Sequence, residues 1–243
     1  MGLYEQLKKL ACSISREDLR RCVLGMLEDP RMTITKVEPL VTLEKSPAAP
    51  KKHHAFEGGL LLHTYSVALL ALRISEVVER VYGIRVDRDL VLAAAILHDL
   101  YKFYQYRYDE REQQFKPRKD WYLSHDYAMV AELARRQCSD DLIRIVSEVH
   151  GTVPISTIEG LVVHLADSID ARLGEYIQNR ILEELKDLES LCGIKQMQLL
   201  SIAVTELGIG RAFELALWGD LSNELRRVLE ARGLCTNRAG QSQ

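Results

Sequence analysis

All seven histidines of this 243-residue chain lie between residues 53 and 164, and one of them forms the dipeptide His98-Asp99. The dipeptide follows an apolar run from Leu90 to Leu97. Neutral imidazole nitrogens and carboxylate oxygens are common ligands of divalent metal ions. The distribution therefore predicts a metal site gathered on one side of a helical fold.

The elements that must position these side chains are almost all helical, because apolar residues recur at steps of three and four. Residues 31–57 lack that period, and we expect an extended connector there. Alternating aromatics over residues 101–122 predict a hairpin or an aromatic flap. The fold class is thus all-α. Helices are predicted to begin near residues 3, 15, 59, 87, 124, 139 and 156, with three more segments between residues 169 and 232.

Helical phase places several of the polar candidates on buried faces. His98, His150 and Asp167 each extend an apolar line on their own helix. A buried polar group without a partner costs about 1–3 kcal/mol. These groups must therefore satisfy one another or share a cation. His63 lies at the start of an apolar stripe on its own helix, so we expect its side chain to point inward as well. The stripe consists of Val67, Leu70, Ile74, Val77 and Val81.

Four segments resemble the HD-domain metal-dependent phosphohydrolases: residues 59–64 (GLLLHT), 94–102 (AAILHDLYK), 148–151 (EVHG) and 163–170 (VHLADSID). They occur in the order typical of that family, and the resemblance covers about residues 53–175. It implies a helical HD bundle.

The resemblance also implies a set of metal ligands. His63, His98, Asp99 and Asp167 would hold a first metal, and Asp99 would bridge to a second. In the binuclear branch of the family the second metal would be held by His125 and His150. Family members often carry two adjacent histidines where this chain has Val149-His150, so the second site stays open at this point.

The resemblance also suggests residues that take part in catalysis, bind the phosphate or support the metal ligands. Asp99 and Lys102 are the expected catalytic residues, with the Lys102 cation neutralising charge on a phosphoryl oxygen. His54 is expected to reach the phosphate, although His53 and His54 with the preceding lysines can instead form a surface basic patch. His164 is expected to support a metal ligand or to be structural.

The aromatic segment 101–122 gives two further candidates. Tyr101 and Tyr104 are expected to contact the substrate by stacking on a base or pterin ring. The alternative is that the aromatic residues of this segment pack on the core or on each other.

The chemistry that these groups support is metal-assisted hydrolysis, because a metal lowers the pKa of bound water and polarises a phosphoryl oxygen. One or two divalent ions are expected. The family favours iron(II) or manganese, and zinc is possible.

The substrate follows from a narrower resemblance. Residues 46–54 (SPAAPKKHH), which lead into the glycine pair, are most similar to archaeal dihydroneopterin 2′,3′-cyclic phosphate phosphodiesterases. They also resemble the HD module of bacterial 3′-5′ exoribonucleases, which follows an oligonucleotide-binding barrel; the 52 residues here are too few for one. A small 2′,3′-cyclic phosphate is the expected substrate. A 3′-5′ exoribonuclease or nucleotide phosphatase, and a non-catalytic nucleotide-sensing HD module, are the alternatives.

Composition limits the partners and the location. A formal net charge of −3 gives no field that attracts nucleic acid or an anionic membrane. The apolar runs are shorter than the roughly 20 residues of a membrane span, and no signal peptide is evident, so we expect a cytoplasmic protein. A homodimer through the C-terminal helices is possible.

Cysteine spacing and composition complete the expectations. Five widely spread cysteines, odd in number, predict free thiols and no disulfide framework.

The expected domains are N-terminal helices and connector (1–50), an HD metal-binding core (51–175), C-terminal helices packed on that core (176–235) and a frayed tail (236–243).

Overall fold

Helices account for most of the computed structural model, which describes residues 2–235, so the all-α prediction is confirmed. Its α-helices are α1 (Leu3–Cys12), α2 (Glu17–Glu28), α3 (Gly59–Tyr82), α4 (Arg88–Leu97), α5 (His125–Arg135), α6 (Asp140–Val149), α7 (Ile158–Glu184), α8 (Lys186–Cys192), α9 (Gln196–Leu207), α10 (Ile209–Trp218) and α11 (Leu221–Ala231). Two 3₁₀ helices are η1 (Leu43–Lys45) and η2 (Leu100–Gln105).

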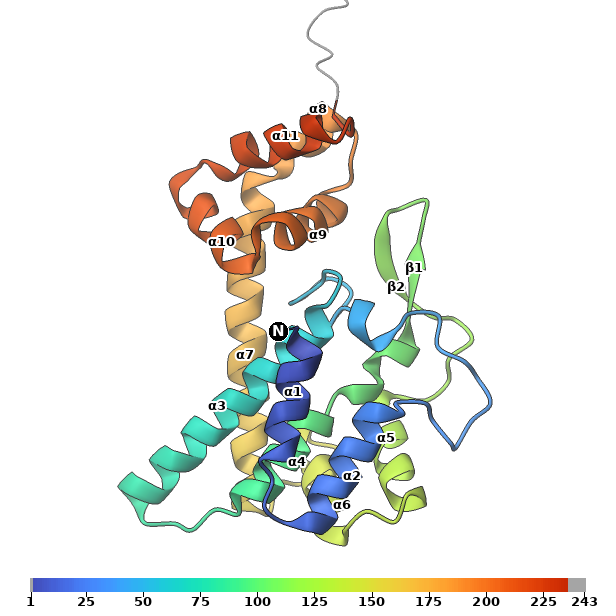
Figure 1. Cartoon of the computed structure of the whole chain (residues 1–243), viewed down its shortest axis with the longest axis vertical. Helices are drawn as coiled ribbons and strands as arrows, with labels where there is room; N and C mark the ends of the chain where they lie inside the picture. Colours follow the sequence, from blue (N-terminus) through green and yellow to red (C-terminus); the bar gives the residue numbers. More distant parts are fainter. Residues whose placement is uncertain (1, 236–243) are drawn as a thin grey trace, which may run out of the picture.

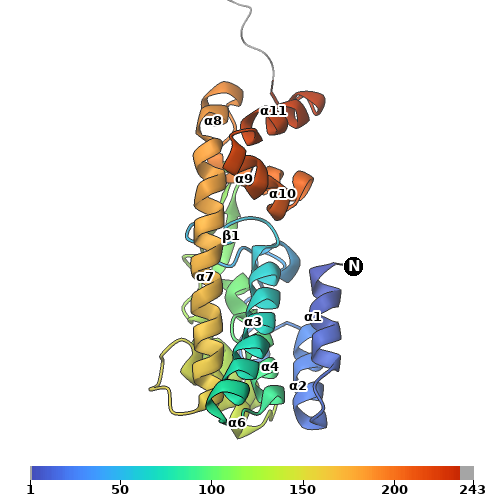
Figure 2. The same cartoon turned by 90° about the vertical axis from the view of Figure 1, so that its left-hand side faces the viewer.

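The helix α7 runs the length of the molecule and carries a cluster of helices at each end (Figure 1). In the side view α3 and α4 lie between α7 and the pair α1–α2 (Figure 2). The main core is built from α1 to α7, whereas α8 to α11 pack with the end of α7 in a second hydrophobic cluster. The domain boundary expected after residue 175 falls inside α7, and the tail 236–243 lies outside the described residues.

The helix α3 begins and ends at glycines, as the sequence indicated. Gly58 and Gly83 have φ angles of +83° and +66°, a region that favours glycine. The apolar stripe headed by His63 is buried only in part: Val67 is buried, but Val77 is 52% exposed and Val81 70% exposed. The reason is that the end of α3 projects beyond the body of the molecule (Figure 1).

The same helix is long and apolar enough to cross a membrane by length and composition alone, whereas the short apolar runs of the sequence predicted no such helix. In this structure it packs against α4 and α7 and carries the fully buried His63. Packing on both sides by other helices is typical of a core helix.

The predicted hairpin is confirmed. Strands β1 (Tyr106–Asp109) and β2 (Gln114–Pro117) pair antiparallel, with Tyr106 opposite Pro117 and Asp109 opposite Gln114. The hairpin projects from the core toward the C-terminal helices (Figure 1). It places Tyr106 at its base, four residues after Lys102.

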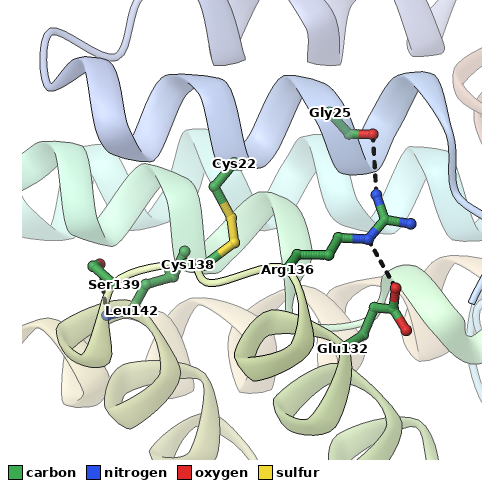
Figure 3. Close-up of a disulfide and its surroundings, with 7 residues drawn as sticks. All are labelled: Cys22, Gly25, Glu132, Arg136, Cys138, Ser139 and Leu142. Carbon is green, nitrogen blue, oxygen red and sulfur yellow. Dashed lines mark hydrogen bonds and ion pairs between the residues drawn. A yellow bond between two sulfur atoms is a disulfide. The ribbon is translucent and has the colours of Figure 1, made fainter. Parts of the chain in front are cut away.

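The prediction that the cysteines are free thiols is wrong for four of them. Cys22 in α2 is bonded to Cys138, which lies in the turn between α5 and α6 (Figure 3). Cys192 is bonded to Cys235, and Cys12 is free and exposed. Sequence spacing failed here because the bonded pairs are 116 and 43 residues apart, and only the packing of distant helices brings their sulfur atoms together.

Candidate metal centre

Four ligand atoms of the predicted first set lie together in the interior. His63 comes from the first turns of α3, His98 ends α4, Asp99 follows it, and Asp167 lies on α7. The His63 Nε2 atom is 3.1 Å from both Asp99 Oδ2 and Asp167 Oδ1. His98 Nε2 lies 3.5 Å from Asp99 Oδ2 and 3.8 Å from Asp167 Oδ1. The structure thus groups the four residues as one candidate site.

The predicted second set adjoins the first through Asp99. His125 begins α5, and His150 directly follows α6. The Nε2 atoms of His125 and His150 each lie 3.2 Å from Asp99 Oδ1, the oxygen that the first set does not use. The two carboxylate oxygens of Asp99 therefore face two different groups of ligands.

The donor atoms fit a metal because they lie close together and most of them are enclosed without a hydrogen-bond partner. Two donors bound at about 2.1 Å to one ion lie about 3.0 Å apart at a right angle and about 3.4 Å apart in a tetrahedron. The His63, His125 and His150 separations of 3.1–3.2 Å match that range, and the two His98 separations are slightly longer, at 3.5 and 3.8 Å. In the described structure no hydrogen-bond partner is present for the enclosed atoms His63 Nε2, His98 Nε2, Asp99 Oδ1, His125 Nε2 and His150 Nε2, whereas Asp99 Oδ2 contacts the Lys102 ammonium.

Hydrogen bonds at the other ring nitrogens fix the orientation of two ligands. His63 Nδ1 lies 2.6 Å from Asp170 Oδ2, and His98 Nδ1 donates to the Ala95 carbonyl at 2.8 Å. Each ring therefore presents the lone pair of Nε2 to the site. His164 takes a structural position, as expected, because its Nδ1 donates to the Val149 carbonyl at 2.7 Å next to His150.

The electrostatics of the set also favour a cation. Burial opposes a charge on His63, but the carboxylates of Asp167, Asp170 and Asp99 outweigh that effect and raise its pKa to about 10. Burial acts against an ionised Asp99 as well, yet the neighbouring Lys102 ammonium and His98 hold the pKa of Asp99 well below its usual range. The site thus carries ionised carboxylates that attract positive charge.

Lys102 lies where the resemblance places it. Its Nζ atom is 2.5 Å from Asp99 Oδ2, and the side chain is mostly buried. Tyr101, the residue before Lys102, occupies the first turn of η2. A buried ammonium next to the bridging carboxylate is well placed to meet a phosphoryl oxygen.

His53 and His54 differ in their surroundings. His54 is buried, and its ring lies against α7 where a Cβ added to Gly174 would come within 2.2 Å of it. His53 is half-buried, its Nδ1 lies 3.1 Å from that of His54, and its ring centroid is 5.1 Å from that of His63. Burial lowers the pKa of His53 to about 3 and that of His54 to about 4, so both rings are neutral at pH 7.

These positions correct the interpretation of the two histidines. They do not form a surface basic patch, because both rings adjoin the metal ligands. His54, expected to reach the phosphate, is covered, and its Nε2 lies 3.7 Å from Asp170 Oδ2. It therefore supports His53 and Asp170, and His53 is the more accessible of the pair.

The prediction that Tyr101 and Tyr104 contact the substrate is also wrong. Their exposed fractions are 0% and 1%, because both rings pack in the main core with Phe103. The Tyr104 hydroxyl accepts a hydrogen bond from the Met32 backbone N–H. The alternative that aromatic side chains of this segment pack on the core holds for these two residues.

Comparison with known proteins identifies the family. The family model for the HD domain matches residues 60–172. The chain is 39% identical, over 70% of its own length and 70% of the relative's, to a dihydroneopterin 2′,3′-cyclic phosphate phosphodiesterase of Methanocaldococcus jannaschii. This chain belongs to the HD-domain family. Members of the family are metal-dependent phosphohydrolases, and the chain is therefore a hydrolase with a divalent-metal site.

More distant relatives match a smaller share of the chain. The 3′-5′ exoribonucleases YhaM of Bacillus subtilis and Bacillus licheniformis are each 29% identical over 58% of the chain, and the match spans 46% of their own length. No solved structure matches this chain.

Sequence reasoning missed two carboxylates at the centre. Asp170 orients His63, and Asp126 Oδ1 lies 2.7 Å from His125 Nε2. Both were within reach of sequence signals: Asp170 follows Asp167 by nearly one helical turn, and Asp126 directly follows His125.

Proposed function

We propose that this chain is a phosphodiesterase that opens a small 2′,3′-cyclic phosphate attached to a pterin or nucleotide-like group. The observation that carries the proposal is the shared Asp99 carboxylate, whose two oxygens face two sets of unpartnered imidazole nitrogens beside Lys102. The pterin cyclic phosphate named for the archaeal relative supports the choice of substrate.

The first ion would be held by His63, His98, Asp99 and Asp167, and the second by Asp99, His125 and His150. Divalent ions there supply Lewis acidity and lower the pKa of water toward neutrality. Iron(II) or manganese is our choice, since mixed nitrogen and oxygen donors without thiolate suit these metals.

The reaction adds water across one phosphorus–oxygen bond of the ring. That bond breaks, the released ribose-like or side-chain oxygen takes a proton, and the product is a phosphomonoester beside a free hydroxyl. Lys102 neutralises charge that develops on the non-bridging oxygens. His53, neutral and half-buried at the edge of the ligands, is placed to hydrogen-bond the phosphate in the role expected of His54.

A cavity of about 400 Å³, whose lining includes the residue before the ligand His125, suits the organic part of such a substrate. Its volume lies within the usual range for small-molecule sites. The residues Pro50, Tyr106, Arg118, Trp121, Tyr122 and Ser124 line it, and Ser124 directly precedes the ligand His125. Aromatic walls next to the phosphate site favour a planar heterocycle.

The decisive experiment is an assay of the protein loaded with manganese or iron(II) on 2′,3′-cyclic phosphates, with the phosphomonoester product followed by phosphorus NMR. We expect ring opening by the native chain and at least a 1,000-fold loss in His98→Ala, on the order of the loss when a group essential to catalysis is removed. Asp141→Asn, an exposed residue on α6, is the control and should retain native activity.

The outcomes separate the candidate functions. Shortening of single-stranded RNA, with cyclic phosphates left intact, would favour the exoribonuclease alternative supported by the YhaM relatives. A metal-loaded protein that is inert toward every phosphoester would favour a sensing module. Activity that survives in His98→Ala would contradict the assignment of the site.

A further inference from the structure

Asp126 is an acidic residue in the first turn of α5 whose surroundings point to the second metal site. Its Oδ1 atom is 2.7 Å from His125 Nε2 and 3.8 Å from His150 Nε2. Both nitrogens also face Asp99 Oδ1 at 3.2 Å. Asp126 therefore faces the same pair of imidazoles as Asp99.

These contacts lack the geometry of well-formed hydrogen bonds. Asp126 Oδ1, Asp99 Oδ1, His125 Nε2 and His150 Nε2 are all enclosed, and each lacks a hydrogen-bond partner in the described structure. At 2.7 Å the Asp126 carboxylate and the His125 ring nitrogen approach each other without a well-formed hydrogen bond, and a positive charge shared by the two groups would stabilise this approach.

A structural role for Asp126 accounts less well for this arrangement. A carboxylate in the first turn of a helix gains from the helix dipole and from free backbone N–H groups. Asp126 Oδ1, however, accepts no backbone N–H, and it turns toward the histidines. The helix terminus therefore does not explain its position.

The separations match those of ligands around one ion. Neighbouring donors bound at about 2.1 Å are about 3.0–3.4 Å apart, and opposite donors about 4.2 Å apart. The four distances, from 2.7 to 3.8 Å, lie near this range. The first site already has four protein donors, and without Asp126 the second has three.

We propose that Asp126 is a fourth protein ligand of the second metal, completing a set with Asp99, His125 and His150. The carboxylate supplies a donor where this chain lacks a second adjacent histidine, and it adds a negative charge that a neutral imidazole does not carry. This inference rests on the proposed metal centre, and it makes the chain a two-metal protein.

The test is a titration of the metal-free protein with manganese(II). Calorimetry measures the number of ions and their affinities, and electron paramagnetic resonance detects coupling between paired ions. We expect two ions and a coupled signal in the native chain. In Asp126→Asn, which keeps the shape of the side chain, the affinity of the second ion should fall at least 10- to 100-fold, and the spectrum at the same concentration should be that of a single ion.

Three variants control the interpretation. His150→Ala should also lose the second ion, and Asp141→Asn, which removes the same charge from an exposed position, should bind as the native chain does. Asp126→Ala repeats the test with a smaller side chain in case the amide disturbs folding, which circular dichroism checks.

Two ions bound with native affinity by Asp126→Asn and Asp126→Ala would overturn the assignment of Asp126 and leave the proposed function standing. A native chain that binds one ion would overturn the second site as a whole. A native chain that binds none would contradict the proposed function itself.

Discussion

His54 lies beneath the metal ligands, and its position depends on glycines. A Cβ at Gly174 would lie 2.2 Å from the His54 ring, and a Cβ at Gly59 would lie 2.0 Å from the His54 carbonyl oxygen. The His54 φ angle of +45° belongs to the left-handed region, so the backbone there is held by these contacts. A chain of close contacts therefore links Gly174 on α7 to the His54 ring, the His54 ring to Asp170, and Asp170 to His63.

We expect Gly174→Ala to destabilise the protein by about 1–3 kcal/mol, because the added methyl group overlaps a buried ring. The same change should reduce activity, since displacement of His54 disturbs the Asp170–His63 hydrogen bond. Urea unfolding and the cyclic phosphate assay measure the two effects.

Gly25→Ala in α2 is the matched control, because a Cβ there meets nothing within 4 Å. It should stabilise the helix by about 0.5–1 kcal/mol. If Gly174→Ala and Gly25→Ala have the same free energy of unfolding, the packing of the His54 ring does not require a glycine at position 174.

At the scale of elements, the Cys22–Cys138 disulfide joins α2 to the turn between α5 and α6 (Figure 3). Arg136 in the same turn donates to the Gly25 carbonyl and to Glu132, so polar contacts support the same junction. The bond closes a long loop that contains α3 and α4, which carry His63 and His98.

Replacing both cysteines, as Cys22→Ser with Cys138→Ser, should lower the free energy of unfolding by about 2–5 kcal/mol. The physical reason is that the cross-link restricts the unfolded chain over 116 residues. Urea unfolding of the oxidised protein measures the loss.

Cys12 is free and exposed and gives the control: Cys12→Ser should have the same midpoint of urea unfolding as the native chain. A double variant as stable as the native chain under oxidising conditions would contradict a stabilising role for the bond.

At the scale of the molecule, all the proposed metal ligands belong to the main core, whereas the second hydrophobic cluster holds α8 to α11. The two clusters are joined by the continuous α7 (Figure 2). Metal binding should therefore stabilise one part of the molecule more than the other.

Removal of the metal by a chelator should lower the melting temperature, because ligand at 100 times its dissociation constant contributes about 2.7 kcal/mol. Hydrogen–deuterium exchange should rise in α3, α4 and α5 and change little in α9 to α11. A uniform rise over both clusters would instead show that the protein unfolds and responds to metal as one unit.

The sequence by itself determined the helical fold and the hairpin, because periodicity is a local signal. Its resemblance to the HD-domain family implied the first ligand set, His63, His98, Asp99 and Asp167, and left the second set, with His125 and His150, open. Only the tertiary structure decided that Tyr101 and Tyr104 are buried, that His53 is more open than His54, and that Cys22 meets Cys138. It also placed Asp126 against two imidazoles. These features depend on how distant helices pack, and the local pattern of residues does not contain that information.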